Sequence, residues 1–557
     1  MKRLGNRLLI LLCLVLISLC LLLISMRSQG KELLTPQANQ QTEAKAIETS
    51  QPNDSLAYIN EEIKANPEDP LAWVKLTLFY SNPKSEPEDI NELYEAIMKS
   101  ITFIHKHPKR GNEAYAIWRA AYLPEKQRTK KLKALDKAIQ KDPNNLDLYE
   151  QRANLYLSME QQELAQVDFL QMIYVSPNDK KGYEALGELG HDNVSPIWAS
   201  ILTLAPTAPK AYYRASEYFR MGGSWDEAKD LAIEGLSRYG DDEDHTLYNH
   251  LCFLLSRSDS DDERLASKLQ KEIRKHPKDV KWTLLLETLY TGPCQAFPEK
   301  AIRCLQDALK KVPKQNKTSY LSLIDRMPKN YVELGDLDSA LMYLNMAIKI
   351  DPSFAGYHYN KAMILHAFGD TRAAITELDN YFAHPNSNKE DPEAYYKRAS
   401  YKTEIKDLSG ALADVERAMA KDTAPTASAY LIRGDIYAAQ GKRELAKADY
   451  KTVLENTSSD DSRTRVFALI GLGDKKQAMQ ILTDQINRYK EIDDLDDSNF
   501  YLLLRALMEH RKVELARYFR EISTEWNYPY PCIGENTRVV KNNPKYKELQ
   551  KRGINIL

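Results

Sequence analysis

From about residue 55 onward, hydrophobic and polar residues alternate with the period of an α-helix, and the strict alternation typical of strands is nearly absent. The stretch from Asn145 to Pro177 shows the pattern over one unit. Tyr149, Ala153 and Tyr156 form one apolar stripe, a short turn follows, and Ala165, Phe169 and Met172 form a second stripe before Pro177. This pattern predicts two antiparallel helices joined by a tight turn.

Large and small residues alternate in the same register further along the chain. In residues 429–450, small residues stand at Gly434 and Ala446, bulky rings stand at Tyr430, Tyr437 and Tyr450, and Gly441 follows the first helix. Small residues let two helices approach closely while the rings fill the spaces beside them, and a glycine tolerates the turn at the helix end. The alternation therefore indicates packing. We expect the 33 tyrosines to bury their rings and to direct their hydroxyls to water.

The pattern returns about every 34 residues, as in Tyr115, Tyr149 and Tyr183 and again in Tyr248 and Trp282. A unit of this length, with an aromatic residue at its fourth position, small residues at its eighth and twentieth and proline at its thirty-second, resembles the tetratricopeptide repeat. The fourth position is occupied by Trp73, Tyr115, Tyr149, Tyr183, Tyr212, Tyr248, Trp282, Tyr395 and Tyr430. The resemblance covers residues 55 to 525 and implies an all-α fold, an α-solenoid of about twelve helical pairs in two arrays.

Departures from the period suggest the boundaries of the parts. We expect a flexible linker at 31–54, a first array at 55–313, a hinge or irregular repeat at 314–330, where Pro328 interrupts a helix, and a second array at 331–527. Residues 528–557 leave the repeat, and their "NPKYKELQKRGI" resembles the short proline-initiated helix that closes such arrays.

The first 30 residues predict export. Lys2, Arg3 and Arg7 precede Leu8 to Met26, which is uncharged and, at about 1.5 Å per residue, roughly as long as a bilayer core is thick. The segment reads either as a retained membrane anchor, with the repeats on the exported, periplasmic side, or as a cleaved signal peptide of a secreted or periplasmic protein. Lipidation at Cys20 is a weaker alternative, because the bulky Leu19 precedes the cysteine.

The composition narrows the choice of partner. With 77 basic and 79 acidic side chains, the formal charge is −2, which does not favour nucleic acid as a ligand of the whole chain. Four cysteines outside the apolar segment are too few for a disulfide framework. Cys294 and Cys304 are near enough in sequence to pair, although isolated thiols are the favoured interpretation.

No catalytic, cofactor or metal motif is present. The phosphate-binding glycine patterns, the H-E-x-x-H motif and the G-x-S-x-G motif are all missing. His245 and His250 are five residues apart, so on a helix they point in different directions. We expect the carboxylates of acidic runs such as residues 241–244 to be exposed to water and to have the same surroundings as one another. The sequence therefore predicts no enzyme, no cofactor and no metal site.

The resemblance implies where a partner binds. Positions two, five, nine and twelve of each first helix line a concave groove in this family and are free to serve a ligand. They correspond here to the candidate groove residues Tyr213, Glu217, Arg220, Tyr359, Met363, His366, Tyr396, Ser400 and Asp435. The alternative is that the tyrosines merely cover Tyr212 and Tyr395. Glu150 stands where family members that bind acidic chaperone tails carry lysine, so that partner is not expected.

The sequence thus favours a non-enzymatic scaffold that binds a protein or peptide. An exported glycan- or nutrient-binding protein on the same repeats is the alternative, although such proteins usually carry long tryptophan-bearing loops and this chain has six tryptophans and short connections. A regulatory subunit of a membrane enzyme is a third class, which differs in its partner.

Overall fold

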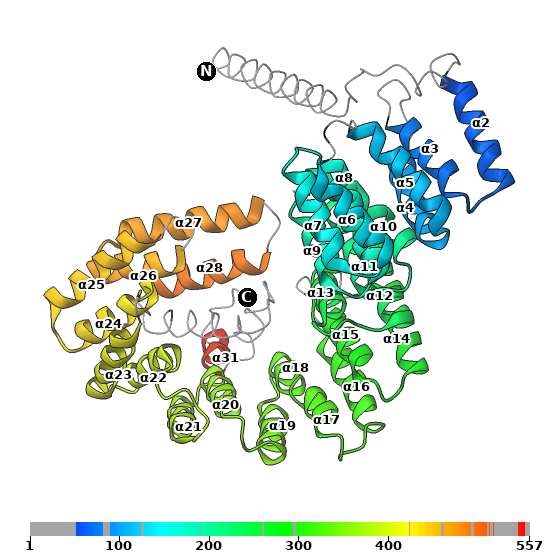
Figure 1. Ribbon diagram of the computed structural model, residues 1–557. Helices are drawn as coiled ribbons and strands as arrows, with labels where there is room; N and C mark the ends of the chain where they lie inside the picture. Colours follow the sequence, from blue (N-terminus) through cyan, green and yellow to red (C-terminus); the bar gives the residue numbers. More distant parts are fainter. Residues whose placement is uncertain are drawn as a thin grey trace, which may run out of the picture. The chain divides into compact units, whose positions relative to one another are not determined.

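The computed structural model of this protein describes residues 52–81, 90–123, 129–189, 191–258, 261–292, 297–422, 424–457, 462–491, 495–509 and 544–551, together with residues 127, 512 and 516. Within these ranges every regular element is a helix and no strand occurs. The fold is all-α and consists of successive antiparallel helix pairs, as the hydrophobic period predicted (Figure 1). The chain divides into two compact units, residues 1–254 and 255–557.

Unit 1 has a hydrophobic core that includes residues from Val74 to Ala215. Its helices are α2 (Pro52–Ala65), α3 (Pro70–Tyr80), α4 (Ile90–Lys106), α5 (Pro108–Tyr122), α6 (Lys130–Lys141), α7 (Leu146–Leu157), α8 (Gln162–Val175), α9 (Lys180–Gly187), α10 (His191–Leu204), α11 (Pro209–Met221), α12 (Trp225–Tyr239) and α13 (Thr246–Leu255), the last of which ends at the division.

Unit 2 has a core that includes residues from Leu284 to Tyr546. Its helices are α14 (Glu263–Lys275), α15 (Val280–Tyr290), α16 (Pro298–Leu309), α17 (Lys317–Ile324), α18 (Met327–Leu334), α19 (Leu337–Ile350), α20 (Gly356–Ala367), α21 (Thr371–Ala383), α22 (Pro392–Glu404), α23 (Leu408–Lys421), α24 (Ala427–Ala439), α25 (Arg443–Asn456), α26 (Ser462–Leu472), α27 (Lys475–Glu491), α28 (Leu495–Glu509) and α31 (Pro544–Lys551).

The close approach predicted at Gly434 is confirmed. A Cβ atom built at Gly434 would lie 2.9 Å from Cε1 of Tyr450, a ring that is almost fully buried. Ala446 is buried as well, so α24 and α25 pack through these small residues. Gly441 has a φ of 75°, in the left-handed region that favours glycine, and directly follows the first helix of this pair and its cap Gln440.

Two tyrosines at the fourth position, Tyr149 and Tyr183, direct their hydroxyls to backbone carbonyls, so the expectation that these hydroxyls point to water was wrong for them. The hydroxyl of Tyr149 donates to the carbonyl of Pro143 at 2.9 Å, and Tyr183 donates to Pro177 at 2.9 Å. The indole of Trp73 donates to Pro67 in the same way at 2.8 Å. Each aromatic residue thus bonds the carbonyl six residues before it and ties the start of its helix to the preceding turn.

Ion pairs that are buried or partly buried join the two helices within three repeats. In each pair an arginine of the first helix donates through Nε and Nη2 to both oxygens of an aspartate sixteen residues later. The pairs are Arg152 with Asp168, Arg398 with Asp414, and Arg433 with Asp449. Such bidentate pairs set the relative rotation of the two helices.

The expected break at 314–330 differs from the observed division. Leu323, Ile324 and Met327 are fully buried in the core of unit 2, and α17 and α18 occupy the segment. The structure instead divides between Leu254 and Leu255. The expected domain boundaries otherwise stay predictions.

The expectation of a membrane anchor was wrong for the helices that the structure describes. The described helices contain at most 17 residues, and none is long and apolar enough to cross a bilayer, which needs about 20 apolar residues. The proposed segment, Leu8 to Met26, and Cys20 lie outside the described residues.

Two further expectations concern cysteines and the chain end. Cys304 is a free thiol whose Sγ donates to the carbonyl of Ala301, whereas Cys294 lies outside the described residues. The C-terminal helix starts at Pro544 as predicted. Its Lys545 lies beside Glu404 of α22, a residue more than a hundred positions earlier, so α31 does more than close the last repeat.

Candidate functional site

Three first helices of successive pairs, α20, α22 and α24, form a row in unit 2, here called the first-helix row. The hydroxyl of Tyr359 on α20 donates to Oε1 of Glu393 on α22 at 3.3 Å. The hydroxyl of Tyr396 on α22 lies 3.5 Å from Oδ2 of Asp422, in the turn before α24. The first contact links neighbouring repeats, and the second joins α22 to the end of α23 in the same pair.

Tyr396 is half-buried, and its surroundings keep the phenol protonated. Desolvation raises the pKa of Tyr396 to about 12, and the nearby carboxylate of Asp422 adds to the effect. At neutral pH the hydroxyl is therefore a hydrogen-bond donor that holds its place beside a carboxylate. On the same face of α22, Ser400 and Glu404 follow at intervals of four residues, and Ser400 is half-buried.

Two candidate residues on α20 point into the protein. Met363 is 7% exposed and His366 is fully buried. Nε2 of His366 lies 2.8 Å from Oε1 of Glu404, and its ring stacks on Tyr401 with a centroid distance of 3.9 Å. Thr371 donates to the other oxygen of Glu404 at 3.1 Å. These residues, His366, Thr371, Tyr401 and Glu404, are called the Glu404 cluster below.

Asp435 serves the packing of its own repeat. The hydroxyl of Tyr450 donates to Oδ1 of Asp435 at 2.7 Å, which holds the ring against Gly434. The structure thus brings Tyr359, Met363, His366, Tyr396 and Ser400 together on adjacent helices, while Asp435 is tied to the interior of its helix pair.

The other three candidate residues lie on one face of α11 in unit 1. Arg220 donates from Nε and Nη2 to the two oxygens of Glu217 at 3.1 and 2.6 Å. Desolvation opposes the ionisation of Glu217, but the hydrogen bond from Arg220 and the charge of His250 outweigh it, so the pKa of Glu217 is lowered. Tyr213 lies one turn before Glu217, with its ring edge-on to His250 at 5.1 Å. This group is the α11 surface.

His250 is a partner that the sequence interpretation missed. Its Nδ1 lies 3.3 Å from Oε2 of Glu217, and its Nε2 lies 2.9 Å from Oγ of Ser216. Burial lowers the pKa of His250, although the charge of Glu217 opposes this shift. The sequence spacing could have predicted this contact, because His250 follows Ser216 by 34 residues, which is one repeat length. Residues one period apart occupy equivalent places on neighbouring first helices.

The contacts from Ser216 through His250 to Glu217 follow the order of a hydrolytic triad. A substrate, however, cannot reach the serine. Ser216 is fully buried, and its hydroxyl donates to the carbonyl of Ala228 at 2.7 Å. A nucleophilic serine gives its proton to histidine and faces the substrate. Here that proton is engaged by the backbone, so the arrangement can lock α11 against α12 and α13 but cannot attack a substrate as it stands.

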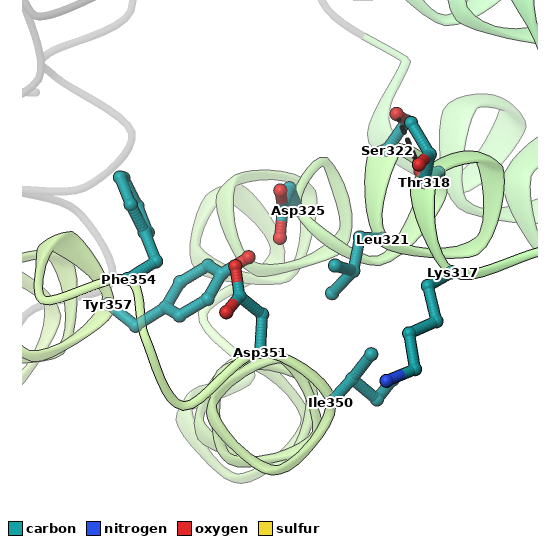
Figure 2. A pocket seen from close by; sticks show the side chains of 9 residues that line it. All are labelled: Lys317, Thr318, Leu321, Ser322, Asp325, Ile350, Asp351, Phe354 and Tyr357. Atoms are coloured by element: carbon teal, nitrogen blue, oxygen red, sulfur yellow. Dashed lines mark hydrogen bonds between the residues drawn. The ribbon is translucent and has the colours of Figure 1, made fainter.

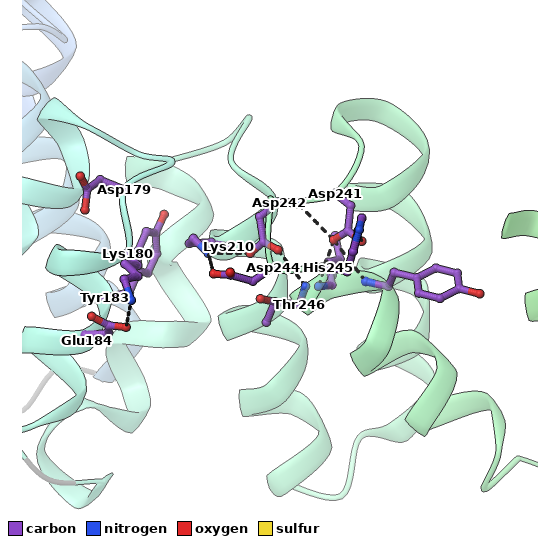
Figure 3. Close-up of polar contacts among 12 residues, drawn as sticks. Asp179, Lys180, Tyr183, Glu184, Lys210, Asp241, Asp242, Asp244, His245 and Thr246 are labelled. Carbon is purple, nitrogen blue, oxygen red and sulfur yellow. Dashed lines mark hydrogen bonds and ion pairs between the residues drawn. The ribbon is translucent and has the colours of Figure 1, made fainter. Parts of the chain in front are cut away.

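The acidic run at residues 241–244 is not uniformly solvated, so that expectation was wrong (Figure 3). Oδ1 of Asp241 accepts from the backbone amides of Leu247 and Tyr248 at 3.2 and 3.3 Å, at the start of α13. Asp242 accepts from the amide of Thr246 and from Nζ of Lys210, both at 2.7 Å. The run therefore caps a helix and joins α11 to the turn before α13.

A pocket of about 470 Å³ opens between α17, the end of α19 and the start of α20 (Figure 2). Phe354 is 53% exposed at its edge and packs edge-on against the buried Tyr357 at 4.9 Å. The carboxylates of Asp325 and Asp351 and the side chain of Lys317 also line it. Desolvation raises the pKa of Asp325, although the hydroxyl of Tyr357 opposes the shift.

In the part of the chain that the structure describes, no group of three or more histidine, cysteine, aspartate or glutamate side chains could hold a metal ion. The candidate surfaces consist of aromatic and hydrogen-bonding side chains on repeated helices. Repeated helix pairs with residues of this kind on their first helices define the class of helical repeat scaffolds.

Two models of the tetratricopeptide repeat match the chain, at residues 134–167 and 427–460. The first match covers most of α6, all of α7 and the start of α8, and the second covers α24 and α25. Each of the two units therefore contains a segment that matches a tetratricopeptide repeat. No curated protein matches it.

Several solved structures are similar to parts of the chain. A tetratricopeptide repeat protein from Parabacteroides merdae ATCC 43184 is 16% identical, with 47% of this chain and 98% of that one covered and a TM-score of 0.32. MamA is 20% identical, with 31% and 92% covered and a TM-score of 0.24. Yeast Tom70 is 14% identical, with 82% and 97% covered and a TM-score of 0.34.

Proposed function

We propose that this protein is a non-enzymatic scaffold that binds a protein or peptide partner through the first-helix row of unit 2. Tetratricopeptide repeat scaffolds are usually protein-interaction modules and are generally non-catalytic. The observation that carries the proposal is the line of half-exposed Tyr359, Tyr396 and Ser400 on adjacent helices. Tyrosines that combine a ring with a donor hydroxyl are favoured at protein interfaces, and here they are pre-positioned by Glu393 and Asp422.

The α11 surface offers a second contact region within unit 1. Arg220 lies over the ring of Phe253, with its Cζ 5.5 Å from the centroid, and Phe253 is 37% exposed. The neighbouring Met221 is 53% exposed. Arginine and aromatic side chains beside exposed apolar atoms are typical of residues that dominate binding energy. The two carboxylate bonds hold Arg220 in a defined orientation before a partner arrives.

The test is site-specific photo-crosslinking in cells. A benzoylphenylalanine placed at Ser400 reports on the first-helix row, and one placed at the exposed Gln140 of α6 is the control. We expect a discrete crosslinked protein from position 400 alone, and its loss when Tyr359 and Tyr396 are both changed to alanine. Equal products from both positions, or products that the double substitution leaves unchanged, would contradict the proposal.

The pocket of Figure 2 favours a second candidate, glycan binding. An exposed aromatic ring, Phe354, stands beside two carboxylates that can accept hydrogen bonds from sugar hydroxyls. A glycan array probed with the full chain and with Phe354→Ala distinguishes the two candidates. Glycan binding that depends on Phe354 would support this second function, whereas its absence would leave the protein-binding proposal alone.

A further inference from the structure

The C-terminal helix α31 is docked against unit 2 through one of its ends. Tyr546 is fully buried within the core cluster of unit 2, and Lys545 is half-buried. The side chains of Lys547, Glu548 and Lys551 are exposed. Figure 1 shows α31 among the helices of unit 2, close to α20. Among the side chains of α31 whose burial the structure describes, the consecutive Lys545 and Tyr546 are the ones that are half-buried or buried.

The lysine meets a carboxylate that other residues already hold in place. Nζ of Lys545 lies 4.0 Å from Oε2 of Glu404. The two oxygens of Glu404 also bind His366 and Thr371, at 2.8 and 3.1 Å. Burial lowers the pKa of Lys545, and the charge of Glu404 opposes that shift. A carboxylate held in place by two hydrogen bonds, beside a core that buries the next side chain, can receive a cation followed by a ring.

An eight-residue helix is too short to be stable by itself in water, because isolated helices need about 12–15 residues. The helical form of α31 therefore depends on its contacts with unit 2. Glu404 follows Tyr396 and Ser400 at intervals of four residues and is the last residue of α22, so α31 contacts the end of a helix that carries the surface proposed above for partner binding. A segment from the end of the chain thus contacts α22, one helix of the first-helix row.

We propose that Glu404 and its neighbours form a binding site for a short helix that carries a Lys–Tyr pair, and that α31 occupies this site until a partner with the same pair replaces it. The inference rests on the proposed function and names the chemistry of the partner. The inference predicts that α31 and an added ligand compete for the site. If α31 leaves the site free for only a fraction of the time, the apparent affinity for the added ligand is reduced to that fraction.

The experiment measures binding of a fluorescent peptide with the sequence of residues 542–557 to the full chain. The peptide is titrated into the wild-type protein and into Tyr546→Ala, a variant in which the internal helix loses its anchor. We expect the variant to bind the peptide at least about tenfold more tightly than the wild type. Lys545→Met in the full chain is the second releasing variant, and circular dichroism reports whether each variant is folded.

Matched peptides identify the contact. In the released protein, a Lys545→Met peptide should bind about three- to tenfold more weakly, since charge-assisted contacts contribute on the order of 1 kcal/mol. A Lys547→Met peptide, altered at the exposed lysine, should bind like the parent. Combining the Lys545→Met peptide with Glu404→Gln in the protein should produce no further loss, because both changes remove one contact.

Equal affinity of wild type and both releasing variants, or equal binding of the two methionine peptides, would overturn the inference. The proposed function has a separate readout. If crosslinking from position 400 persists while no peptide binds, the partner uses the first-helix row but does not resemble α31. If crosslinking is lost and peptide binding follows the expected pattern, the Lys–Tyr site stands without the broader function.

Discussion

Arg152 and Asp168 form a bidentate ion pair in which Nε and Nη2 of the arginine lie 2.9 and 2.6 Å from the two carboxylate oxygens. The same sixteen-residue relationship joins Arg433 to Asp449, but the surroundings differ. The side chains of the first pair are 4% and 0% exposed, whereas Arg433 is 25% exposed. Equivalent contacts in different repeats therefore contribute differently to stability.

Replacing Arg152 with methionine should lower the free energy of unfolding by about 3–5 kcal/mol, because Asp168 would become an unpaired buried charge. Arg433→Met should cost about 1 kcal/mol, since water reaches that pair. Urea denaturation followed by circular dichroism compares the two variants. Lys64→Met, at an ion pair whose side chains are both more than 70% exposed, is the control and should change stability by less than about 0.5 kcal/mol. Equal losses for Arg152 and Arg433 would refute this ranking.

Gly434→Ala should destabilise unit 2 by about 1–3 kcal/mol, although alanine is the better helix former by about 1 kcal/mol. The new Cβ would meet the ring of Tyr450, which cannot move away because Asp435 binds its hydroxyl and Gly471 packs on its other side. Thermal unfolding measures the effect.

Gly187→Ala is the matched control for this substitution. The nearest atom to a Cβ at Gly187 is Nη2 of Arg214, at 4.0 Å, so alanine fits without displacement. We expect that variant to be neutral or slightly stabilising. A neutral Gly434→Ala would show that Tyr450 has room to shift.

Acidification should weaken unit 1 through His105. Desolvation, with a contribution from the charge of Arg152, lowers the pKa of His105 to about 4, whereas the unfolded chain has a value near 6.5. The unfolded state therefore binds more protons in this window, so stability is present above pH 6.5 and is lost as the pH falls towards 4, by on the order of 1–3 kcal/mol.

Urea midpoints at pH 7, 6, 5 and 4 test this dependence. His105→Phe keeps a ring next to Tyr174, whose centroid lies 4.8 Å from that of His105, but cannot be protonated, so it should flatten the profile. Changing the exposed His276 to glutamine should leave the dependence of stability on pH as it is in the wild type. An unchanged profile in His105→Phe would assign the acid sensitivity to other groups.

Ser216 should not react with a fluorophosphonate probe, because its side chain is fully buried and its hydroxyl is bonded to the Ala228 carbonyl. Ser216→Ala should instead lower stability by about 1–2 kcal/mol through loss of these buried hydrogen bonds. Mass spectrometry of the probe-treated protein gives the answer. Labelling of Ser216 in the folded wild type would reveal an accessible nucleophile and would count against a purely structural role.

The helix pairs and their packing follow from the sequence because they depend on short-range spacing. Ala153 and Ala165 are fully buried at the predicted contact points, and Gly441 has the left-handed conformation expected after a helix. The same reasoning placed Tyr359 and Tyr396 on adjacent first helices. A fixed period makes such positions equivalent, so one repeat predicts the others.

The partners of these residues required the tertiary structure. His366 and Met363 occupy the positions of a groove by their spacing, yet they are buried because Glu404, Tyr401 and Thr371 close around His366. The contact of Lys545 with Glu404 joins residues 141 positions apart, which no periodicity relates. Repetition determines which face of a helix a side chain occupies, but whether another segment covers that face depends on long-range packing, and local sequence does not encode it.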